Sequence, residues 1–385
     1  FDHFYGFNSG ISNYWNPAPT GPDGKAIPTI GNTKWRDDKK TMRPYRPEDP
    51  DWYATDALTD KAVGWLDKHG RQDKPWFLYM AYNAPHWPLH APYEEVKPYL
   101  DVYKAGYEKI RAQRFQRLQA LGLADPDAGQ PPTARIKSWS KLSAEERRKE
   151  IECMSVYAGM ITRMDRNIGK LIEKIRQQGE MDNTLILFFS DNGASAERLG
   201  RILKSAHKRY TPTGDETPGS VMTYSFLGPN WGPVANTPLR GCKLKVDEGG
   251  ICSPMIVHWP RGITERNGLR RDPCHLVDIV PTLLSVAGGA YPDTFRGKPI
   301  DAPVDGVDIS KTFRGEGLPA DRNLFFSYGG SAVLNKHWKA QKKGNQWRLF
   351  KYENRRLIMK NVADKHPDIV NPMAKAWETY YQTHR

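Results

Sequence analysis

Unbroken apolar runs are the strongest pattern along the chain. Residues 185–189 are five consecutive large apolar residues, and the run stops at Ser190-Asp191-Asn192-Gly193. A run of this length, bounded by polar and turn residues, is typical of a strand buried on both faces of a sheet. Trp76–Tyr82 has the same character, and a further strand is expected over Ile251–Trp259. We therefore expect three strands, of which those at 185–189 and Trp76–Tyr82 are buried.

Apolar residues recur at helical spacing in two other segments. Thr55–His69 places its apolar residues on one face, which predicts an amphipathic helix. A longer segment opens on the capping box Ser143-Ala-Glu-Glu146 and closes at Gly179. We expect its apolar stripe to pack on the sheet. Arg163 and Asp165 lie off the stripe, and their expected place is a solvated face.

Three stretches lack a continuous pattern. Residues 1–54 are rich in Gly, Pro, Asn, Trp and Tyr, which predicts surface loop with at most one short strand. Pro92–Lys141 is charged and aromatic, with a helix expected near Val102–Gln119, and Ala194–Pro238 is rich in small and turn residues. Long loops in compact domains usually carry function. Substrate choice is therefore expected to lie in the last two stretches.

The pattern changes again near the C-terminus. A helix is expected over His275–Ala287, and short aromatic runs over 325–352 then predict an antiparallel meander. A final helix is expected at about Pro367–Thr383. The chain as a whole is predicted to be α/β, with a large, mostly parallel or mixed sheet flanked by helices over residues 1–320. Residues 321–385 are predicted to form a small subdomain of antiparallel sheet plus helix.

Composition and charge narrow the classes of partner. The 57 Lys and Arg against 44 Asp and Glu give a formal net charge of +13, which favours an anionic glycan, nucleic acid or small molecule. Basic residues dispersed over a solvated surface would give the same excess. No aromatic-and-basic nucleic-acid motif is present, so we expect no nucleic-acid partner. The four cysteines lack Cys-x-x-Cys spacing, which indicates neither a zinc site nor a disulfide framework. No run is long enough to span a bilayer, and no feature fixes an oligomeric state.

Candidate metal ligands follow the central apolar run. Asp191 and Asn192 stand at the C-terminal end of a predicted strand, and ligands of open α/β sheets bind outside the carboxyl ends of the strands. A carboxylate beside a carboxamide suits a hard cation, because both offer oxygen. The alternative is a strand that ends in an Asx turn without any metal.

Two cationic side chains are candidates for catalysis. His86 lies in a segment whose backbone is held by flanking prolines, which favours a positioned side chain. His90 follows four residues later, but the intervening proline argues against the helix that a zinc-binding His-x-x-x-His pair needs. Lys243 stands between Arg240 and Glu248-Gly-Gly250, ahead of a predicted strand. The alternatives are a structural histidine and an ordinary surface lysine.

Taken in chain order, these segments resemble the sulfatases of the alkaline phosphatase superfamily, the arylsulfatase-like hydrolases of sulfate esters. The segments that carry the resemblance are Phe1-Asp-His-Phe-Tyr-Gly-Phe7, Ala84-Pro85-His86-Trp87-Pro88, Ser190–Gly193, Arg240-Gly-Cys-Lys243, Glu248-Gly-Gly250, Pro254–Pro260 and Val277–Thr282. The resemblance implies an alkaline phosphatase-like fold, with Asp191 and Asn192 as two ligands of a calcium ion. It also implies that His86 and Lys243 grip the sulfate group and assist departure of the alcohol.

One part of the family's pattern is missing. The nucleophile of the family is a formylglycine made within a Cys/Ser-x-Pro-x-Arg motif, and Cys252-Ser-Pro254 has Ile256 where the arginine would stand. The family's early Asp-Asp metal pair is missing too. Asp37-Asp38 does not replace it, because its polar surroundings predict a solvated, ion-paired turn. We therefore expect an N-terminally truncated sulfatase that is inactive by itself, with its formylglycine upstream of Phe1.

The resemblance also implies a reaction and a cellular location. The expected activity is hydrolysis of sulfate esters, with a sulfated carbohydrate preferred over a small aryl sulfate. A periplasmic or secreted location is expected, although no signal peptide is visible. The alternatives are a phosphatase or phosphonate hydrolase of the same superfamily and a non-catalytic relative that binds sulfated glycans.

Overall fold

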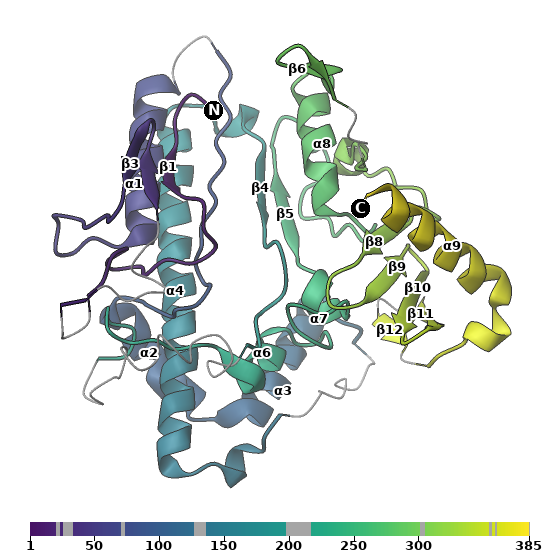
Figure 1. Cartoon of the computed structure of the whole chain (residues 1–385), viewed down its shortest axis with the longest axis horizontal. Coiled ribbons are helices and arrows are strands. Elements are labelled where there is room, and N and C mark those ends of the chain that lie inside the picture. The colour runs from purple at the N-terminus through teal and green to yellow at the C-terminus, as the bar shows by residue number, and fades with distance from the viewer. Residues whose placement is uncertain are drawn as a thin grey trace. The chain divides into compact units, whose positions relative to one another are not determined.

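The computed structural model of the chain (Figure 1) describes residues 1–20, 24–25, 34–70, 74–126, 136–197, 217–300, 305–353, 356–358 and 360–384. Its contacts divide the chain into two compact units. The first unit holds Phe1–Gln116, Gln130–Met181 and Ala194–Cys242, and the second holds Arg117–Gly129, Asp182–Gly193 and Lys243–Arg385.

Long helices dominate the first unit. α1 (Ala54–His69) and α2 (Tyr93–Tyr103) both pack against α4 (Ala144–Gln177), the longest helix (Figure 1). α3 (Gly106–Ala120) begins in this unit, and α6 (Gly228–Ala235) lies within the predicted loop 194–238. The predicted helix near Val102–Gln119 is therefore two helices, broken between Tyr103 and Gly106.

The start of α4 confirms the predicted capping box. Ser143 Oγ accepts a hydrogen bond from the Glu146 N–H (3.1 Å), and Glu146 Oε2 accepts one from the Ser143 N–H (2.7 Å). Arg163 corrects the prediction of a wholly solvated face. Its guanidinium pairs with the partly buried Asp56 carboxylate through Nε (2.9 Å) and Nη2 (2.5 Å). Asp165 is exposed, as expected.

The first 54 residues contain more structure than expected. They form the antiparallel strands β1 (Tyr5–Phe7), β2 (Trp35–Asp37) and β3 (Lys40–Met42) instead of a single short strand. Trp35 is fully buried and packs against aromatic rings of the same segment. The aromatic residues of this stretch therefore serve as core. Asp37 pairs with Lys61 at 2.7 Å, and Asp38 contacts His3, so both carboxylates have partners, as expected.

The predicted strand over Trp76–Tyr82 is wrong. The described residues of this stretch adopt no regular structure, and Phe77 and Tyr79 are 62% and 67% exposed. A strand needs neighbouring strands to satisfy its backbone groups. None of the strands in the described ranges pairs with this segment.

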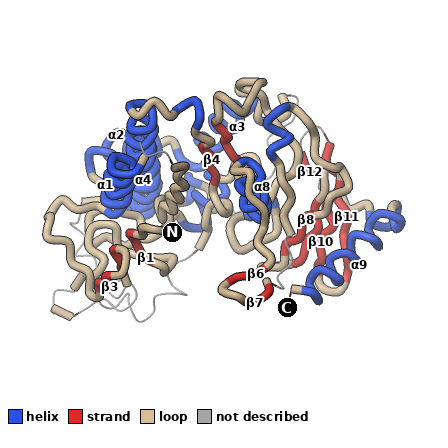
Figure 2. The backbone as a smooth tube through the Cα atoms, turned by 90° about the horizontal axis from the view of Figure 1, so that it is seen from above, coloured by secondary structure: helices blue, strands red, loops and turns tan. Residues whose placement is uncertain are grey.

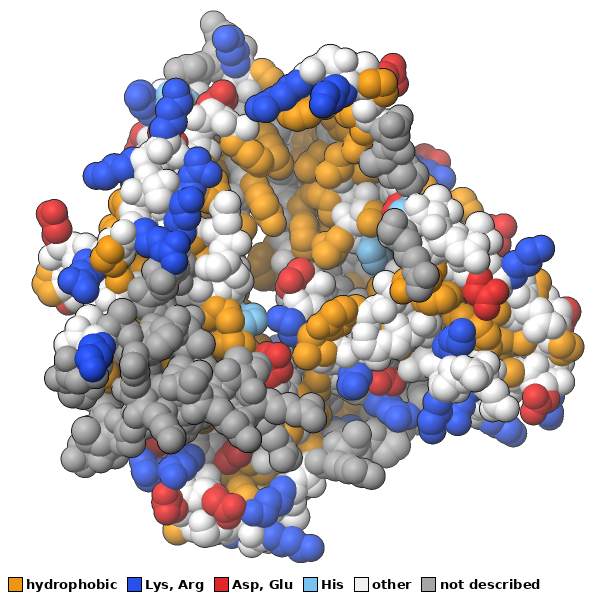
Figure 3. Space-filling view, viewed as in Figure 1, with side chains coloured by type: hydrophobic (Ala, Val, Ile, Leu, Met, Phe, Trp, Pro, Cys, Tyr) orange, Lys and Arg blue, Asp and Glu red, His pale blue; other side chains and the backbone are white. Residues whose placement is uncertain are grey.

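In the second unit, β4 (Ile186–Phe189) pairs with β5 (Met255–His258) in antiparallel register. β4 confirms the predicted strand, but its burial on both faces is wrong. Phe188 and its cross-strand partner Ile256 are 44% and 62% exposed. Figure 3 shows hydrophobic side chains gathered at the surface over β4, β5 and α8 (Ile279–Val286). β5 also begins later than predicted, because Glu248–Ile251 forms the short helix α7.

The C-terminal part of the second unit confirms the predicted meander. β8 (Leu324–Phe326), β9 (Ser331–Leu334), β10 (Trp338–Lys343), β11 (Gln346–Glu353) and β12 (Arg356–Ile358) form one sheet in chain order. α9 (Pro367–Thr383) packs on this sheet (Figure 2), with the Val333, Ala340 and Trp377 side chains buried between them. A hairpin of β6 (Thr294–Phe295) and β7 (Lys298–Pro299) precedes it. The boundary at residue 320 stays a prediction.

The described residues contain helices and small antiparallel sheets, which places the chain in the mixed α/β class. The predicted large, mostly parallel or mixed sheet is not found among them, because every strand pair in the described ranges is antiparallel. No helix among these residues is long and apolar enough to cross a membrane.

Candidate active site

The Asp191-Asn192 turn follows β4 in the second unit. Ser190 Oγ donates a hydrogen bond to the Asn192 carbonyl (2.9 Å), and the Gly193 N–H donates to the Gly250 carbonyl of α7 (3.2 Å). Asp191 is exposed and Asn192 half-buried. Within the described ranges, neither side chain takes part in a hydrogen bond or ion pair. The Ser190 hydroxyl, and not an Asx turn, therefore closes this strand end.

The donor chemistry of this turn fits a hard cation. A carboxylate and a carboxamide oxygen project from adjacent residues, and calcium takes six to eight oxygen ligands. Among the residues that the structure describes, no group of three or more His, Cys, Asp or Glu side chains could hold a metal ion. Asp191 and Asn192 thus offer part of a ligand set.

Lys243 begins the segment that leads into α7. It is half-buried, whereas Val246 and Glu248 further along are buried. Leu244 has a φ of 71°, a conformation that residues with a Cβ seldom adopt. The Gly193–Gly250 hydrogen bond joins this segment to the Asp191-Asn192 turn. The second unit therefore brings three of the four predicted site residues onto two connected segments.

His86 lies in a proline-rich turn of the first unit. Its N–H donates to the Asn83 carbonyl (2.8 Å), and the Tyr14 hydroxyl donates to the His86 carbonyl (3.0 Å). The ring Nδ1 lies 2.8 Å from the Trp87 carbonyl. Because a carbonyl can only accept, Nδ1 carries a proton, and any second proton of the ring sits on Nε2. Backbone and ring are therefore both oriented by neighbours.

Trp87 anchors the same turn. Its buried ring packs against Phe226, and its Nε1–H donates to the Glu197 carboxylate (2.6 Å). The Ser195 hydroxyl donates to the same Glu197 oxygen (3.0 Å). These contacts tie the His86 turn to the beginning of the predicted loop 194–238, of which residues 198–216 lie outside the described ranges.

His90 has a structural role in the first unit. Its Nδ1 accepts from the Tyr14 N–H (3.3 Å), and its Nε2 donates to the Thr223 carbonyl (2.6 Å). Burial lowers the pKa of His90 to about 4. Both ring nitrogens are engaged in a dry environment, so this histidine is neutral near pH 7 and offers no metal ligand.

Sequence reasoning missed one charged partner of the site. Lys339 on β10 is fully buried, and its Nζ donates to Glu248 Oε1 and to the Val246 carbonyl, both at 2.5 Å. The available signal was Glu248 itself, a carboxylate between Asp247 and Gly249 that needs a partner when buried. Its partner lies 91 residues further along the chain.

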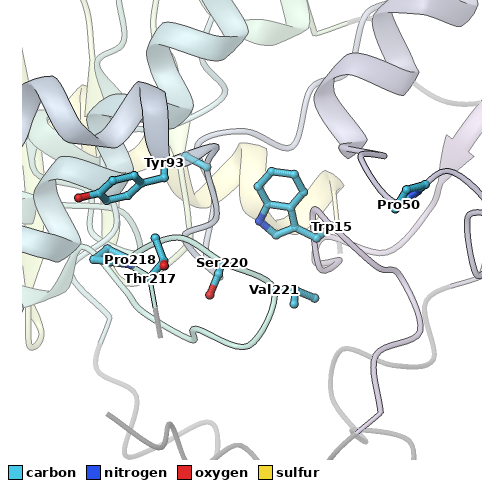
Figure 4. Close-up of a pocket in the computed structure, with 8 residues that line it drawn as sticks. Trp15, Pro50, Tyr93, Thr217, Pro218, Ser220 and Val221 are labelled. Carbon is cyan, nitrogen blue, oxygen red and sulfur yellow. The ribbon is translucent and has the colours of Figure 1, made fainter. Parts of the chain in front are cut away.

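A pocket of about 230 Å³ lies elsewhere in the first unit (Figure 4). Trp15 projects between Tyr93 on one side and Pro50 on the other, and its Nε1–H donates to the Gly219 carbonyl (2.8 Å). None of the four predicted site residues lines this pocket.

The sequence profile of the sulfatase family matches residues 1–290. The chain belongs to the sulfatase family. It is 31% identical over 318 residues to an arylsulfatase of Klebsiella aerogenes, covering 80% of this chain and 65% of that protein. It is 30% identical over 344 residues to an uncharacterized sulfatase of Schizosaccharomyces pombe, covering 86% and 61%. The chain thus spans less than two thirds of the length of these relatives.

Solved structures support the predicted fold class. The crystal structure of Ps i-CgsB in complex with k-i-k-neocarrahexaose matches with a TM-score of 0.64 and 25% identity, covering 99% of this chain and 66% of that one. The structure of BT4656 in complex with its substrate, D-glucosamine-2-N,6-O-disulfate, matches with a TM-score of 0.55 and 14% identity. The match covers 99% of this chain and 77% of that one. The predicted alkaline phosphatase-like α/β class is confirmed.

Proposed function

We propose that this sulfatase hydrolyses sulfate esters of a carbohydrate, with Asp191 and Asn192 as ligands of a calcium ion and His86 and Lys243 at the sulfate group. The observation that carries the proposal is the Asp191-Asn192 turn. Its two oxygen-bearing side chains take part in no hydrogen bond or ion pair within the described ranges, and its backbone is tied to the segment that follows Lys243. Family membership supplies the reaction class.

The chemistry of a sulfate ester assigns a role to each residue. Negative charge grows on the bridging oxygen as the S–O bond breaks. A bound divalent cation would polarise the non-bridging oxygens. Lys243 adds a compact positive charge at the sulfate, and His86 delivers the proton on Nε2 to the departing alcohol. The Trp87 carbonyl holds the opposite ring nitrogen, which keeps the ring oriented for that transfer.

We further propose that a formylglycine outside this chain is the nucleophile. The 385 residues contain no Cys/Ser-x-Pro-x-Arg motif. The exposed pair Phe188 and Ile256 supports the idea that a further part of the protein packs on this face of β4 and β5. The nucleophile and the remaining metal ligands are proposed to lie in that part. By this reasoning, the chain alone binds its substrate without turning it over.

The net charge and the similar structures favour a sulfated glycan as the substrate. The formal net charge of +13 attracts polyanions, and the similar structures include complexes with k-i-k-neocarrahexaose and with D-glucosamine-2-N,6-O-disulfate. We also propose a periplasmic or secreted location, which rests on membership of the sulfatase family.

The metal site is tested by calorimetric titration of this chain with calcium. We expect binding on the order of 10⁻⁴–10⁻³ M, the weak range for a site with few protein ligands, and its loss in the Asp191→Ala/Asn192→Ala variant. Asp182→Ala is the matched control, because Asp182 is an exposed carboxylate in the turn before β4. Equal calcium binding by all three proteins would contradict the assignment.

The reaction is tested with 4-nitrophenyl sulfate and calcium. We expect no turnover by this chain and turnover by a polypeptide that adds an upstream segment with a Cys/Ser-x-Pro-x-Arg motif. Robust turnover by this chain alone would overturn the proposal that the nucleophile lies outside it. A longer polypeptide that binds sulfated glycans without hydrolysing any ester would instead favour a non-catalytic binding protein.

A further inference from the structure

A buried ion pair joins the C-terminal sheet to the segment that carries Lys243. Lys339 is fully buried, and its Nζ lies 2.5 Å from Glu248 Oε1 and 2.5 Å from the Val246 carbonyl. The Tyr352 hydroxyl donates to the same carboxylate oxygen at 3.3 Å. The two charges thus pair directly, and the Lys339 ammonium and the Glu248 carboxylate each take part in two of these hydrogen bonds.

Stability alone is a weak explanation for such a pair. Removing two charges from water carries a desolvation cost that their attraction often only offsets, and apolar replacements of similar volume are frequently as stable. The pair instead fixes the position of a segment. Lys339 binds the Val246 carbonyl and the Glu248 side chain, so it holds the backbone of residues 246–248 at two points. Val246 and Glu248 follow Lys243 by three and five residues.

The alternation of β10 explains why a lysine can reach this place. Successive side chains of a strand point to opposite faces. Ala340 lies in the core beneath α9, so Lys339 points to the other face, where it meets residues 246–248. One face of β10 therefore packs beneath α9, and the other face contacts the segment that follows Lys243.

Two glycines of the β8–β9 turn support the same segment. Gly329 has a φ of +66°, and a Cβ there would lie 1.9 Å from the Leu244 carbonyl oxygen. A Cβ on Gly330 would meet a Val246 methyl at 3.0 Å. The turn thus packs directly against Leu244, whose own φ is positive. Contacts on both sides of Lys245 hold this backbone in an unusual conformation.

We propose that Lys339 is a positioning residue that acts through Glu248 and the Val246 carbonyl to fix the backbone from which Lys243 reaches the sulfate group. The same contacts fix α7, whose Gly250 carbonyl accepts the Gly193 N–H beside Asn192. The C-terminal sheet is then part of the catalytic scaffold. This inference rests on the proposed role of Lys243.

The test measures binding of 4-nitrophenyl sulfate to this chain by calorimetry in the presence of calcium. Lys243→Ala is expected to weaken binding roughly tenfold to a hundredfold, the range for loss of one charge-assisted hydrogen bond. Lys339→Met/Glu248→Met removes both charges together, so that neither is left buried alone. We expect it to weaken binding to a similar extent, and Lys343→Met, at the exposed end of β10, to bind like the unaltered chain.

Two readouts separate positioning from a general effect on stability. Combining Lys243→Ala with the pair variant should weaken binding no further than Lys243→Ala alone, because both changes remove the same contact. Hydrogen exchange should speed up over residues 243–250 and stay slow in β10 and β11. Gly329→Ala should give the same binding defect through a different contact, and it keeps the inference testable if the pair variant does not fold.

The outcomes are distinguishable. If Lys243→Ala binds the ester as well as the unaltered chain, the proposed function of Lys243 fails. If Lys243→Ala is defective but the pair variant and Gly329→Ala bind normally, the proposed function stands and the positioning role is overturned. Additive losses in the combined variant would likewise overturn it.

Discussion

Replacing His90 by glutamine should remove a large part of the acid sensitivity of the fold. In the folded chain its pKa is lowered to about 4 by burial, against about 6.5 for an exposed histidine. A proton on Nδ1 would also face the Tyr14 N–H, which now donates to that nitrogen. The unfolded chain therefore binds this proton more readily than the folded chain does.

The sign and size follow from linkage. Because the folded pKa is depressed, the stability that neutral His90 contributes is present above pH 6.5 and is lost as the pH falls towards 4. A difference of about 2.5 pKa units corresponds to about 3 kcal/mol over the full window, and to about 2 kcal/mol between pH 7 and pH 5.

Urea unfolding at a series of pH values measures this effect. The free energy of unfolding of the unaltered chain should fall more steeply between pH 7 and pH 5 than that of His90→Gln, by about 2 kcal/mol. His337→Gln, which changes an exposed histidine, should keep the steep slope. Parallel curves for the unaltered chain and His90→Gln would refute the reasoning, whatever the stability of the variant at pH 7.

Two further predictions concern α4. Ser143→Ala should lower the free energy of unfolding by about 1 kcal/mol, because it removes the hydroxyl that accepts the Glu146 N–H; Ser140→Ala, in the preceding turn, is the control in the same urea assay. Arg163→Met should cost about 1–3 kcal/mol, because it leaves the partly buried Asp56 carboxylate without its bidentate partner. An unchanged unfolding midpoint in Arg163→Met would show that this ion pair adds nothing to stability.

Local sequence signals were sufficient to predict the elements that depend on residues close together in the chain. The capping box of α4 depends on residues three apart, and the meander depends on turn residues between short runs. Trp76–Tyr82 has an equally good strand pattern but lacks a paired neighbour in the described residues. Pairing is a tertiary property that a single run of residues does not encode.

The candidate site divides in the same way. Asp191 and Asn192 could be named as candidates because they follow an apolar run that ends at Phe189. Lys339 could not, because only the folded sheet brings it to Glu248, and Arg163 met Asp56 across 107 residues for the same reason. Long-range partners of buried charges are fixed by packing, and their sequence neighbourhoods look like ordinary surface.

Asp191, just after β4, has two roles in this account, as a candidate metal ligand and as a charge beside an apolar strand. Residues 185–189 have no charge and no proline, which is the composition of segments that add to one another in cross-β aggregates. Asp191 follows this run closely, and a charge next to an apolar strand acts as a gatekeeper against such growth. Changing Asp191 would therefore remove a candidate metal ligand and a guard against aggregation together. To separate the two effects, the solubility of any Asp191 variant should be measured together with its calcium affinity.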